Sequence, residues 1–429
     1  MSRNHIVRPK RYKSQLIGLT LAVLMGLVYW SLHGLAPSAS LANAELFDAV
    51  WETINENFYD PNFNGVDWAA LGAQYRSQVR EASSPAEKAA LINEMLAPLQ
   101  TSHTHLYTAD TPAYYQILGI FYPRSSELQA QLQDFFSEGK IEYVGIGIVT
   151  HDIDGQTFVK AVFDGSPAAA AGLQAGDQIL SVAGHPFQPI QSFADQVDQP
   201  VKLQIQTSAN PDSQQEITVT PKRFDGATMF LDAMTDSVQV VNKAGRQIGY
   251  IHIWSYAGEQ YQQKLEEELF YGSLKDVDAL VLDVRDGWGG APPNPLHIFT
   301  ARGPSVTTIT RSGQVYTSKS QWEKPVVMLV NEGSRSAKEI LAYAFQHYDI
   351  GPVVGSPTAG AVVAGGPFIM PDNSVLYVAM ADVYVDETVR LEGKGVTPDV
   401  VVPSPIAYAQ GADPQKEQAI STALEMLNS

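Results

Sequence analysis

The spacing of apolar residues separates the chain into stretches of different character, and the first of these is helical. From residue 45 to about residue 122, apolar side chains recur every three or four positions, as Val50 and Ile54 do. Ser84 is followed by Pro85 and, three positions on, by Glu87, which is the signature of a helix start with proline in the first turn. These patterns predict an N-terminal helical region.

The second stretch has the pattern of a small β-rich unit. Short β-type segments occur at residues 143–150, 157–162 and 216–220. Between them lies a Ser-Pro-Ala-Ala helix start, then Gly-Leu, then a Gly-Asp turn, then a strand pattern at residues 178–182.

This order of features resembles that of a PDZ domain, which we place at residues 141–225. PDZ domains bind the C-terminus of a peptide as an added strand at a sheet edge, and backbone N–H groups hold its carboxylate. The resemblance implies that Val144, Gly145, Ile146 and Gly147 form the carboxylate-binding loop of this chain.

In the third stretch, residues 226–429, apolar strands alternate with amphipathic helices. This alternation predicts a largely parallel α/β sheet. The expected strands are residues 247–254, 279–284 and 325–330, and the expected helices are residues 259–271, 336–348 and a closing helix at 415–428. The chain is therefore predicted to be a multidomain α/β protein, with a helical region at 45–125, the PDZ-like domain and a largely parallel α/β core.

Composition narrows the functions open to such a protein. Hydrophobic residues make up 45% of the chain and charged residues 17%, which is typical of globular proteins. The 28 basic residues are outnumbered by 46 acidic ones, and the net charge of -18 would repel phosphate backbones, so nucleic acid is not an expected partner. The absence of cysteine excludes disulfides, thiolate metal sites and a cysteine nucleophile.

Residues 1–44 have the features of an export signal. Basic residues between Arg3 and Lys13 precede a stretch without charged side chains, and Ala42-Asn43-Ala44 supplies small residues for a signal peptidase. The apolar stretch is also long enough for an uncleaved membrane anchor. We expect an exported protein in the periplasm or an equivalent lumenal space, with membrane contact only through this segment if it is retained.

Two loops of the α/β core carry candidate chemistry. Ser336 lies between an apolar strand and a helix, where free N–H groups and the helix dipole favour an anion, although a serine there commonly serves only as a helix cap. The glycine-rich loop at residues 283–290 also follows a strand, and its N–H groups could face the same point, although a plain tight turn explains it equally well.

Taken together, the ordered motifs resemble those of the carboxy-terminal processing and tricorn-type serine proteases. They are Asp-x-Arg with a glycine-rich loop, Ser-x-Ser-Ala-x-Glu, Gly-x-x-Thr-x-Gly and Gly-Val-x-Pro-Asp, here at residues 283–290, 334–339, 355–360 and 395–399. The resemblance implies a serine protease core that needs no cofactor. It makes Ser336 the nucleophile and assigns the oxyanion hole to the N–H groups of Ala337 and of Gly289 or Gly290.

One position departs from the carboxy-terminal processing pattern. The catalytic lysine that typically follows Gly-x-x-Thr-x-Gly is replaced here by Ala361. The tricorn-type branch uses histidine and glutamate instead, and this chain has Ser102, His103 and Glu392 at the matching places. By that resemblance His103 is the base, Glu392 orients the imidazole and Ser102 supports the arrangement. An ordinary imidazole would make activity rise through about pH 6 to 7.

Alternatives remain open at this level. His105 could replace His103 as the base, and Glu392 could be a solvated carboxylate. Two histidines without a third placed ligand do not predict a metal site. The function expected is an exported serine endopeptidase that cleaves polypeptides near C-terminal tails captured by its PDZ domain. The alternative is a catalytically inactive PDZ-containing scaffold that binds exported proteins, and Ala361 is the main argument for it.

Overall fold

The computed structural model describes residues 39–136, 139–290, 296–300, 306–318 and 321–428. Most of the predicted signal or anchor, residues 1–38, lies outside the described residues. The candidate cleavage residues Ala42 to Ala44 fall inside helix α1 (Ala39–Asn57). No helix in the described ranges combines the length and the apolar character needed to cross a membrane.

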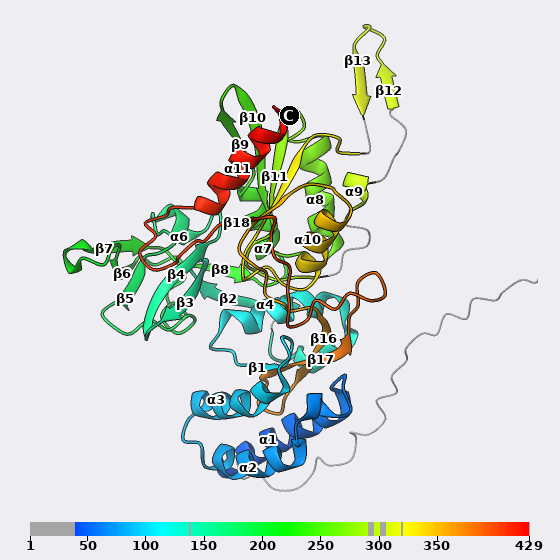
Figure 1. Cartoon of the computed structure of the whole chain (residues 1–429). Coiled ribbons are helices and arrows are strands. Elements are labelled where there is room, and N and C mark those ends of the chain that lie inside the picture. The colour runs from blue at the N-terminus through cyan, green and yellow to red at the C-terminus, as the bar shows by residue number, and fades with distance from the viewer. Residues whose placement is uncertain (1–38, 137–138, 291–295, 301–305, 319–320, 429) are drawn as a thin grey trace, which may run out of the picture. The chain divides into compact units, whose positions relative to one another are not determined.

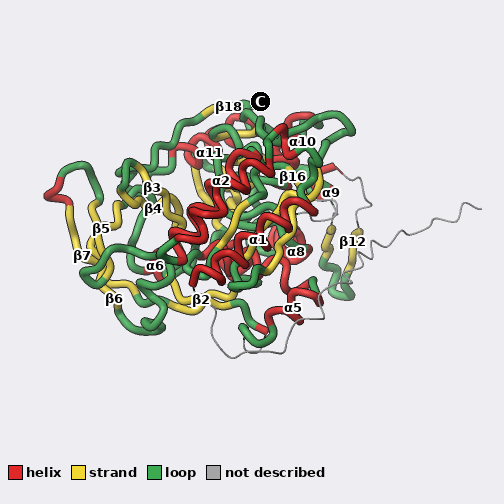
Figure 2. Tube along the Cα trace, turned by 90° about the horizontal axis from the view of Figure 1, so that it is seen from below, coloured by secondary structure: helices red, strands yellow, loops and turns green. Residues whose placement is uncertain are grey.

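The N-terminal region is helical, as predicted, but it is completed by strands from much later in the chain. Helices α1, α2 (Trp68–Glu81) and α3 (Pro85–Leu96) pack together, and Figure 2 shows α1 and α2 side by side. They cover a small antiparallel sheet whose order is β1 (His105–Tyr107), β17 (Val375–Asp382) and β16 (Val363–Ile369). Two shorter helices follow β1: α4 (Pro112–Phe121) and α5 (Ser126–Leu132).

The PDZ-like domain is a five-stranded antiparallel sheet with one short helix. Its strands, in sheet order, are β3 (Ile148–Ile153), β4 (Gln156–Val162), β5 (Gln178–Val182), β6 (Val201–Gln206) and β7 (Gln214–Val219), and its helix is α6 (Pro167–Ala170). The single strand expected at residues 143–150 is broken. Gly147 has a φ of +82°, which divides it into β3 and β2 (Glu142–Gly145), and β2 pairs with β8 (Lys222–Asp225) instead.

The core sheet confirms the predicted parallel α/β architecture (Figure 1). Its six strands, in sheet order, are β18 (Val400–Val401), β15 (Val353–Gly355), β14 (Val326–Val330), β11 (Ala279–Asp283), β10 (Arg246–His252) and β9 (Gln239–Lys243). Strand β9 alone runs antiparallel to its neighbour, at one edge.

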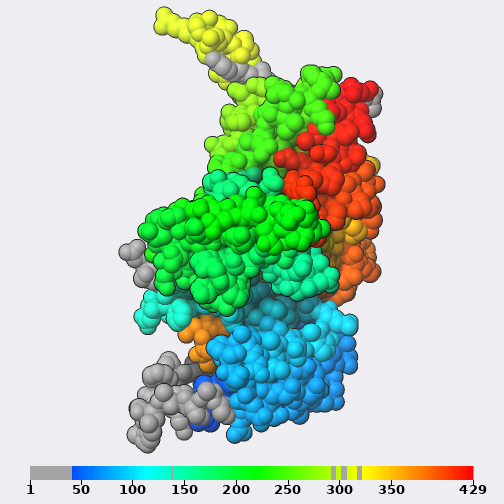
Figure 3. Space-filling view, turned by 90° about the vertical axis from the view of Figure 1, so that its left-hand side faces the viewer, coloured from blue at the N-terminus to red at the C-terminus, as the bar shows by residue number. Residues whose placement is uncertain are grey.

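Side chains of the buried strands alternate between two apolar layers. Leu280 and Leu282 face helices α7 (Met229–Asp236), α8 (Glu259–Phe270) and α10 (Ala337–His347), whereas Val281 faces α11 (Pro414–Met426). The remaining elements are α9 (His297–Thr300) and a hairpin of β12 (Val306–Ile309) and β13 (Val315–Ser318), which projects from the core (Figure 3). Because the strands are parallel, the loops after β10, β11 and β14 meet at one edge of the sheet.

Candidate active site

Ser336 stands at this edge in an uncommon backbone conformation. It follows β14, immediately precedes α10, and has φ 58° and ψ -126°. A positive φ is rare for a residue with a side chain and persists only where neighbouring groups hold it. Here the Ser336 N–H donates to the carbonyl oxygen of Ala361 at 2.9 Å and to Oε2 of Glu339 at 3.2 Å. The backbone of Ser336 is thus fixed by Ala361, which directly follows the Gly-x-x-Thr-x-Gly segment, and by Glu339 of α10.

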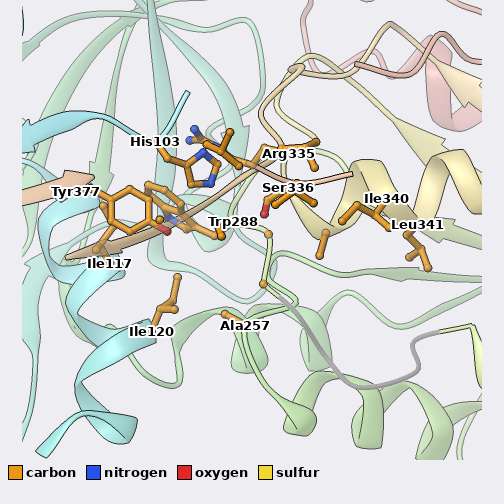
Figure 4. A pocket seen from close by; sticks show the side chains of 18 of the residues that line it. His103, Ile117, Ile120, Ala257, Trp288, Arg335, Ser336, Ile340, Leu341 and Tyr377 are labelled. Atoms are coloured by element: carbon orange, nitrogen blue, oxygen red, sulfur yellow. The ribbon is translucent and has the colours of Figure 1, made fainter. Parts of the chain in front are cut away.

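A cavity of about 600 Å³ brings most of the predicted site residues together (Figure 4). Ser336 and His103 line it, as do Gly289, Gly290 and Ala337. Neither His105 nor Glu392 belongs to its lining. The structure shows no direct hydrogen bond between Ser336 and His103 among the described residues.

A chain of hydrogen bonds connects His103 to Glu392 through Ser102. Oγ of Ser102 lies 2.7 Å from Nδ1 of His103 and donates to Oε2 of Glu392 at 3.0 Å. The N–H groups of Ser102 and Val362 also donate to this carboxylate, at 2.9 Å and 2.6 Å. Glu392 is therefore a buried, fully engaged carboxylate and not a solvated one. Glu392 reaches His103 through the Ser102 hydroxyl, which stands between them.

The hydrogen bonds also determine the tautomer of His103. The single hydroxyl hydrogen of Ser102 is donated to Glu392, so Ser102 Oγ accepts a hydrogen bond from the Nδ1–H of His103. The other ring nitrogen, Nε2, is then left with a free lone pair.

Burial keeps the imidazole of His103 neutral. Only 6% of this residue is exposed, and desolvation, followed by the charge of Arg335, lowers its pKa from 6.5 to about 3. The ordinary value assumed from the sequence is therefore too high for this site. A neutral His103 is ready to accept a proton throughout the physiological pH range.

The glycine-rich loop approaches Ser336 closely. A Cβ atom on Gly289 would lie 2.4 Å from Cβ of Ser336, so a larger residue does not fit there. In the described part of the chain, the N–H groups of Gly289 and Ala337 have no hydrogen-bond acceptor. Two free donors thus border the cavity beside Ser336, at the positions expected from the motifs.

Neither Ala361 nor the nearby Lys338 supplies an amine to the cavity. Ala361 is buried, and its backbone bonds to Ser336 and Glu339. Lys338 is fully buried, which lowers its pKa to about 7, but its Nζ donates to the carbonyl oxygens of Trp254 at 3.1 Å and Asp286 at 2.6 Å. Lys338 therefore stabilises the glycine-rich loop through these hydrogen bonds and does not line the cavity.

The Asp-x-Arg motif is part of the scaffold. Asp283 is fully buried and forms an ion pair with Arg285 at 2.7 Å, while Arg285 also binds Asp413 at 2.7 Å. Burial raises the pKa of Asp283, but the charges of Arg285 and His252 and the hydrogen bonds from Arg285 together outweigh burial and hold that pKa well below its usual range.

We predict that Asp283→Asn lowers the stability of the fold by about 3 kcal/mol, because Arg285 then keeps a buried charge with one partner fewer. A carboxyl whose pKa is depressed in the fold stabilises it above its unfolded pKa of about 3.9 and loses that effect as pH falls. Urea unfolding of the wild type and of Asp283→Asn at pH 7 and pH 3 should show that the difference between their free energies of unfolding is smaller at pH 3. A difference of the same size at both pH values would contradict the lowered pKa of Asp283.

The PDZ-like domain has a groove at the predicted carboxylate-binding loop. A cavity of about 250 Å³ is lined by Gly145, Ile146 and Gly147, by strand β3 and by the start of α4. The side of β3 facing away from β4 is a free sheet edge within the described residues. Val144 belongs to β2, is buried and packs in the domain core, so it supports the loop from inside.

Two side chains, Lys160 and Gln116, connect the PDZ-like domain and its groove to the loops beside Ser336. Lys160 of β4 forms ion pairs with Asp286 at 2.8 Å and with Glu332 at 3.0 Å, which lie in the loops after β11 and β14. Gln116 of α4 lines the PDZ groove and accepts a hydrogen bond from Nε1 of Trp288 at 2.8 Å. Trp288 belongs to the glycine-rich loop, so the two sites share structural support.

The sequence assigned no role to several large side chains that line the cavity, among them Arg335, Trp288 and Tyr377. Arg335 and Trp288 stand next to residues that the motifs singled out, and their large side chains were the only signal available. Tyr377, whose ring centre lies 5.4 Å from that of His103, sits on β17 and gave no signal at all.

Comparison with known proteins agrees with this architecture. Family models match at residues 247–402 (Peptidase family S41), 41–97 (Tricorn protease C1 domain) and 158–206 (PDZ domain). The chain is 28% identical to putative tricorn protease homolog 2 of Streptomyces coelicolor over 92% of its own length, but it spans only 33% of that relative. It is 27% identical to a carboxyl-terminal-processing protease of Synechocystis sp., covering 95% of this chain and 92% of the relative.

Solved structures show the same fold. The photosystem II D1 C-terminal processing protease matches with a TM-score of 0.50 and 22% identity, over 92% of this chain and 98% of that one. The tricorn protease matches with a TM-score of 0.55 and 18% identity, over 92% of this chain and 38% of that one. The chain therefore contains a peptidase family S41 domain at residues 247–402, together with a tricorn-type C1 region and a PDZ domain, and it is similar to carboxyl-terminal-processing proteases.

Proposed function

We propose that this protein is an exported serine endopeptidase that cleaves polypeptides near C-terminal tails captured by its PDZ domain. Ser336 acts as the nucleophile and His103 as the base, held by Ser102 and Glu392. The observation that carries the proposal is the hydrogen-bonded series from Glu392 through Ser102 to His103, which leaves a neutral imidazole in the same cavity as Ser336.

The chemistry is an acyl transfer. His103 Nε2 accepts the hydroxyl proton of Ser336 as Oγ attacks the scissile carbonyl carbon. The imidazolium then gives this proton to the leaving amine, and the peptide bond breaks to form an acyl-enzyme. Water, deprotonated by His103 in turn, releases the acyl group and restores the hydroxyl of Ser336. Glu392 stabilises the transient positive charge through the Ser102 hydroxyl.

The oxyanion of the tetrahedral intermediate is bound by the N–H groups of Gly289 and Ala337. Both donors lack a partner within the described residues and border Ser336. Each such donor contributes about 3 kcal/mol or more to transition-state stabilisation in comparable enzymes. Gly290, whose φ is +137°, supports the loop conformation that directs them.

Export is proposed from the first residues of the sequence. A basic N-terminus followed by an uncharged, mostly apolar stretch has the features of a signal segment. In an exported enzyme, substrates reach the PDZ groove as unfolded or partly folded tails.

Labelling with a serine-directed fluorophosphonate tests the proposal. The purified protein is expected to bind one reagent molecule, and peptide mapping should place it on Ser336. The alternative, an inactive scaffold, predicts no labelling and no cleavage together with intact binding of C-terminal peptides. Labelling at a different serine would contradict the assignment of the nucleophile.

The PDZ groove is expected to act in substrate capture. Gly145 and Tyr143 both line the groove, and a Cβ atom on Gly145 would lie only 3.0 Å from the ring of Tyr143. Gly145→Trp would therefore fill the groove with a bulky ring. We predict at least about a tenfold rise in KM for long substrates with a free C-terminus, and a similar rise when the wild-type enzyme receives the amidated substrate. Fluorophosphonate labelling of Ser336 should stay unchanged.

His151→Trp is the matched control, because this exposed residue of β3 does not line the groove. If labelling of Gly145→Trp falls as steeply as proteolysis, capture alone is not the role of the domain. The contacts of Gln116 with Trp288 and of Lys160 with Asp286 would then transmit the state of the groove to the active site.

A further inference from the structure

Arg335 brings a guanidinium to the end of the cavity where Ser336 and His103 lie (Figure 4). Its Nη2 donates to the carbonyl oxygen of Ser102 at 3.2 Å, and its Cζ lies 5.0 Å from the ring centre of Trp288. Its Nε is buried and has no hydrogen-bond partner among the residues that the structure describes. A buried guanidinium N–H without an acceptor is uncommon, and a bound ligand would supply the missing acceptor.

The charges around the cavity favour an anionic ligand at this point. Arg335 and Arg124 both line the cavity, and none of its described lining residues is acidic. Within the described ranges, Arg335 forms no ion pair with a carboxylate. The chain as a whole carries a net charge of -18 and repels acidic molecules, so this positive site is a local feature.

The position of Arg335 indicates which part of a substrate it meets. In the proposed mechanism His103 gives a proton to the leaving amine, so the released segment passes on the His103 side of Ser336. Arg335 lies on that side, since it binds the carbonyl of Ser102. Figure 4 shows Ile340 and Leu341 beyond Ser336, on the side away from His103, where they suit an apolar side chain of the acyl segment.

We propose that Arg335 binds a carboxylate on the released side of the scissile bond, so that the enzyme prefers substrates that are acidic there. This inference rests on the proposed function. The carboxylate comes from an acidic side chain just after the cleaved bond or from the C-terminus of a short released segment. Both present the same planar group to the guanidinium fork.

The first arm of the test uses paired peptides with amidated C-termini that differ only by Glu or Gln after the cleaved bond. The wild-type enzyme is expected to show a kcat/KM about tenfold or more higher for the Glu peptide, as a partly buried charge-assisted hydrogen bond would give. Arg335→Gln should abolish the preference, and Arg335→Lys should keep part of it. Arg246→Gln is the control. It removes the same charge from an exposed residue at the start of β10, the end away from the active-site loops, and should retain the full preference for the Glu peptide.

The second arm uses short neutral peptides with a free or an amidated C-terminus. Because the PDZ groove also binds a free C-terminus, the ratio of the two kcat/KM values is compared between wild type and Arg335→Gln. The contribution of the groove is common to both enzymes and cancels. A change in the ratio assigns the carboxylate to the C-terminus, and a change confined to the first arm assigns it to a side chain.

Equal losses of kcat/KM for acidic and neutral peptides in Arg335→Gln would overturn the proposal, since Arg335 would then act only by positioning Ser102. Absence of any acidic preference in the wild type would overturn it as well. Peptide binding to Ser336→Ala, followed by fluorescence anisotropy, keeps the two proposals separable. If the wild type cleaves nothing while this variant still binds acidic peptides through Arg335, the proposed function fails and the carboxylate site stands.

Discussion

Replacing Ser336 with alanine is expected to abolish peptide-bond cleavage, with a loss of about 10⁴-fold or more in kcat. The variant keeps the cavity but lacks the oxygen that forms the acyl-enzyme. Stability should change by about 1 kcal/mol, which is the typical cost of losing a helix-capping hydroxyl. Cleavage of an unfolded protein with a free C-terminal tail, measured beside the thermal midpoint of each protein, checks both statements.

Ser356→Ala serves as the matched control for this substitution. Ser356 lies outside the cavity, and its hydroxyl donates to Glu332 at 3.0 Å. This variant should cleave at close to the wild-type rate. Cleavage by Ser336→Ala at a comparable rate would contradict the role proposed for Ser336.

Replacing His103 with alanine is expected to reduce kcat by about 10³-fold or more, because no other described group in the cavity is placed to accept the Ser336 proton. The pH dependence of the wild type is the sharper test. Since burial and Arg335 lower the pKa of His103 to about 3, kcat/KM should stay nearly level from pH 7 to pH 5 and fall only at more acidic pH. Arg335→Gln removes one cause of the lowered pKa of His103, so the fall of kcat/KM at acidic pH should begin at a higher pH in this variant.

The same pKa shift has a consequence for stability with a defined sign. The unfolded chain takes up a proton on His103 as pH falls below about 6.5, whereas the fold resists protonation down to about 3. Stability contributed by the neutral imidazole is therefore lost as pH falls through that interval. A fall in activity at pH 6 to 7 would contradict the lowered pKa of His103. An active His103→Ala protein beside an inactive Lys338→Met protein would overturn its role as the base.

Much of the fold could be predicted from the sequence because its determinants are local. The unbroken apolar run at residues 279–282 predicts a strand that is buried on both faces, and the structure has an apolar layer on each side of β11. Ser84 caps a helix, as its distance from Glu87 in the chain predicts, and its Oγ accepts from the Glu87 N–H at 3.1 Å. A turn or cap depends on a few consecutive residues, so a single sequence is sufficient to identify it.

The sequence also identified Ser336, His103 and Glu392 as candidates, through the order of motifs along the chain. It favoured His103 as the base and left His105, two residues away, as an alternative. The structure separates them: His103 is buried and lines the cavity, whereas His105 begins strand β1, is exposed and does not line it.

Only the tertiary structure placed Ser102 between His103 and Glu392, because residues 290 positions apart in sequence were brought within 3.0 Å. It also decided the electrostatics of the site. The pKa of His103 depends on desolvation by burial and on the charge of Arg335, and neither can be read from neighbouring residues in the chain. Local patterns record which side of an element is buried, whereas contact between distant segments decides what lies against it and so determines the chemistry of the cavity.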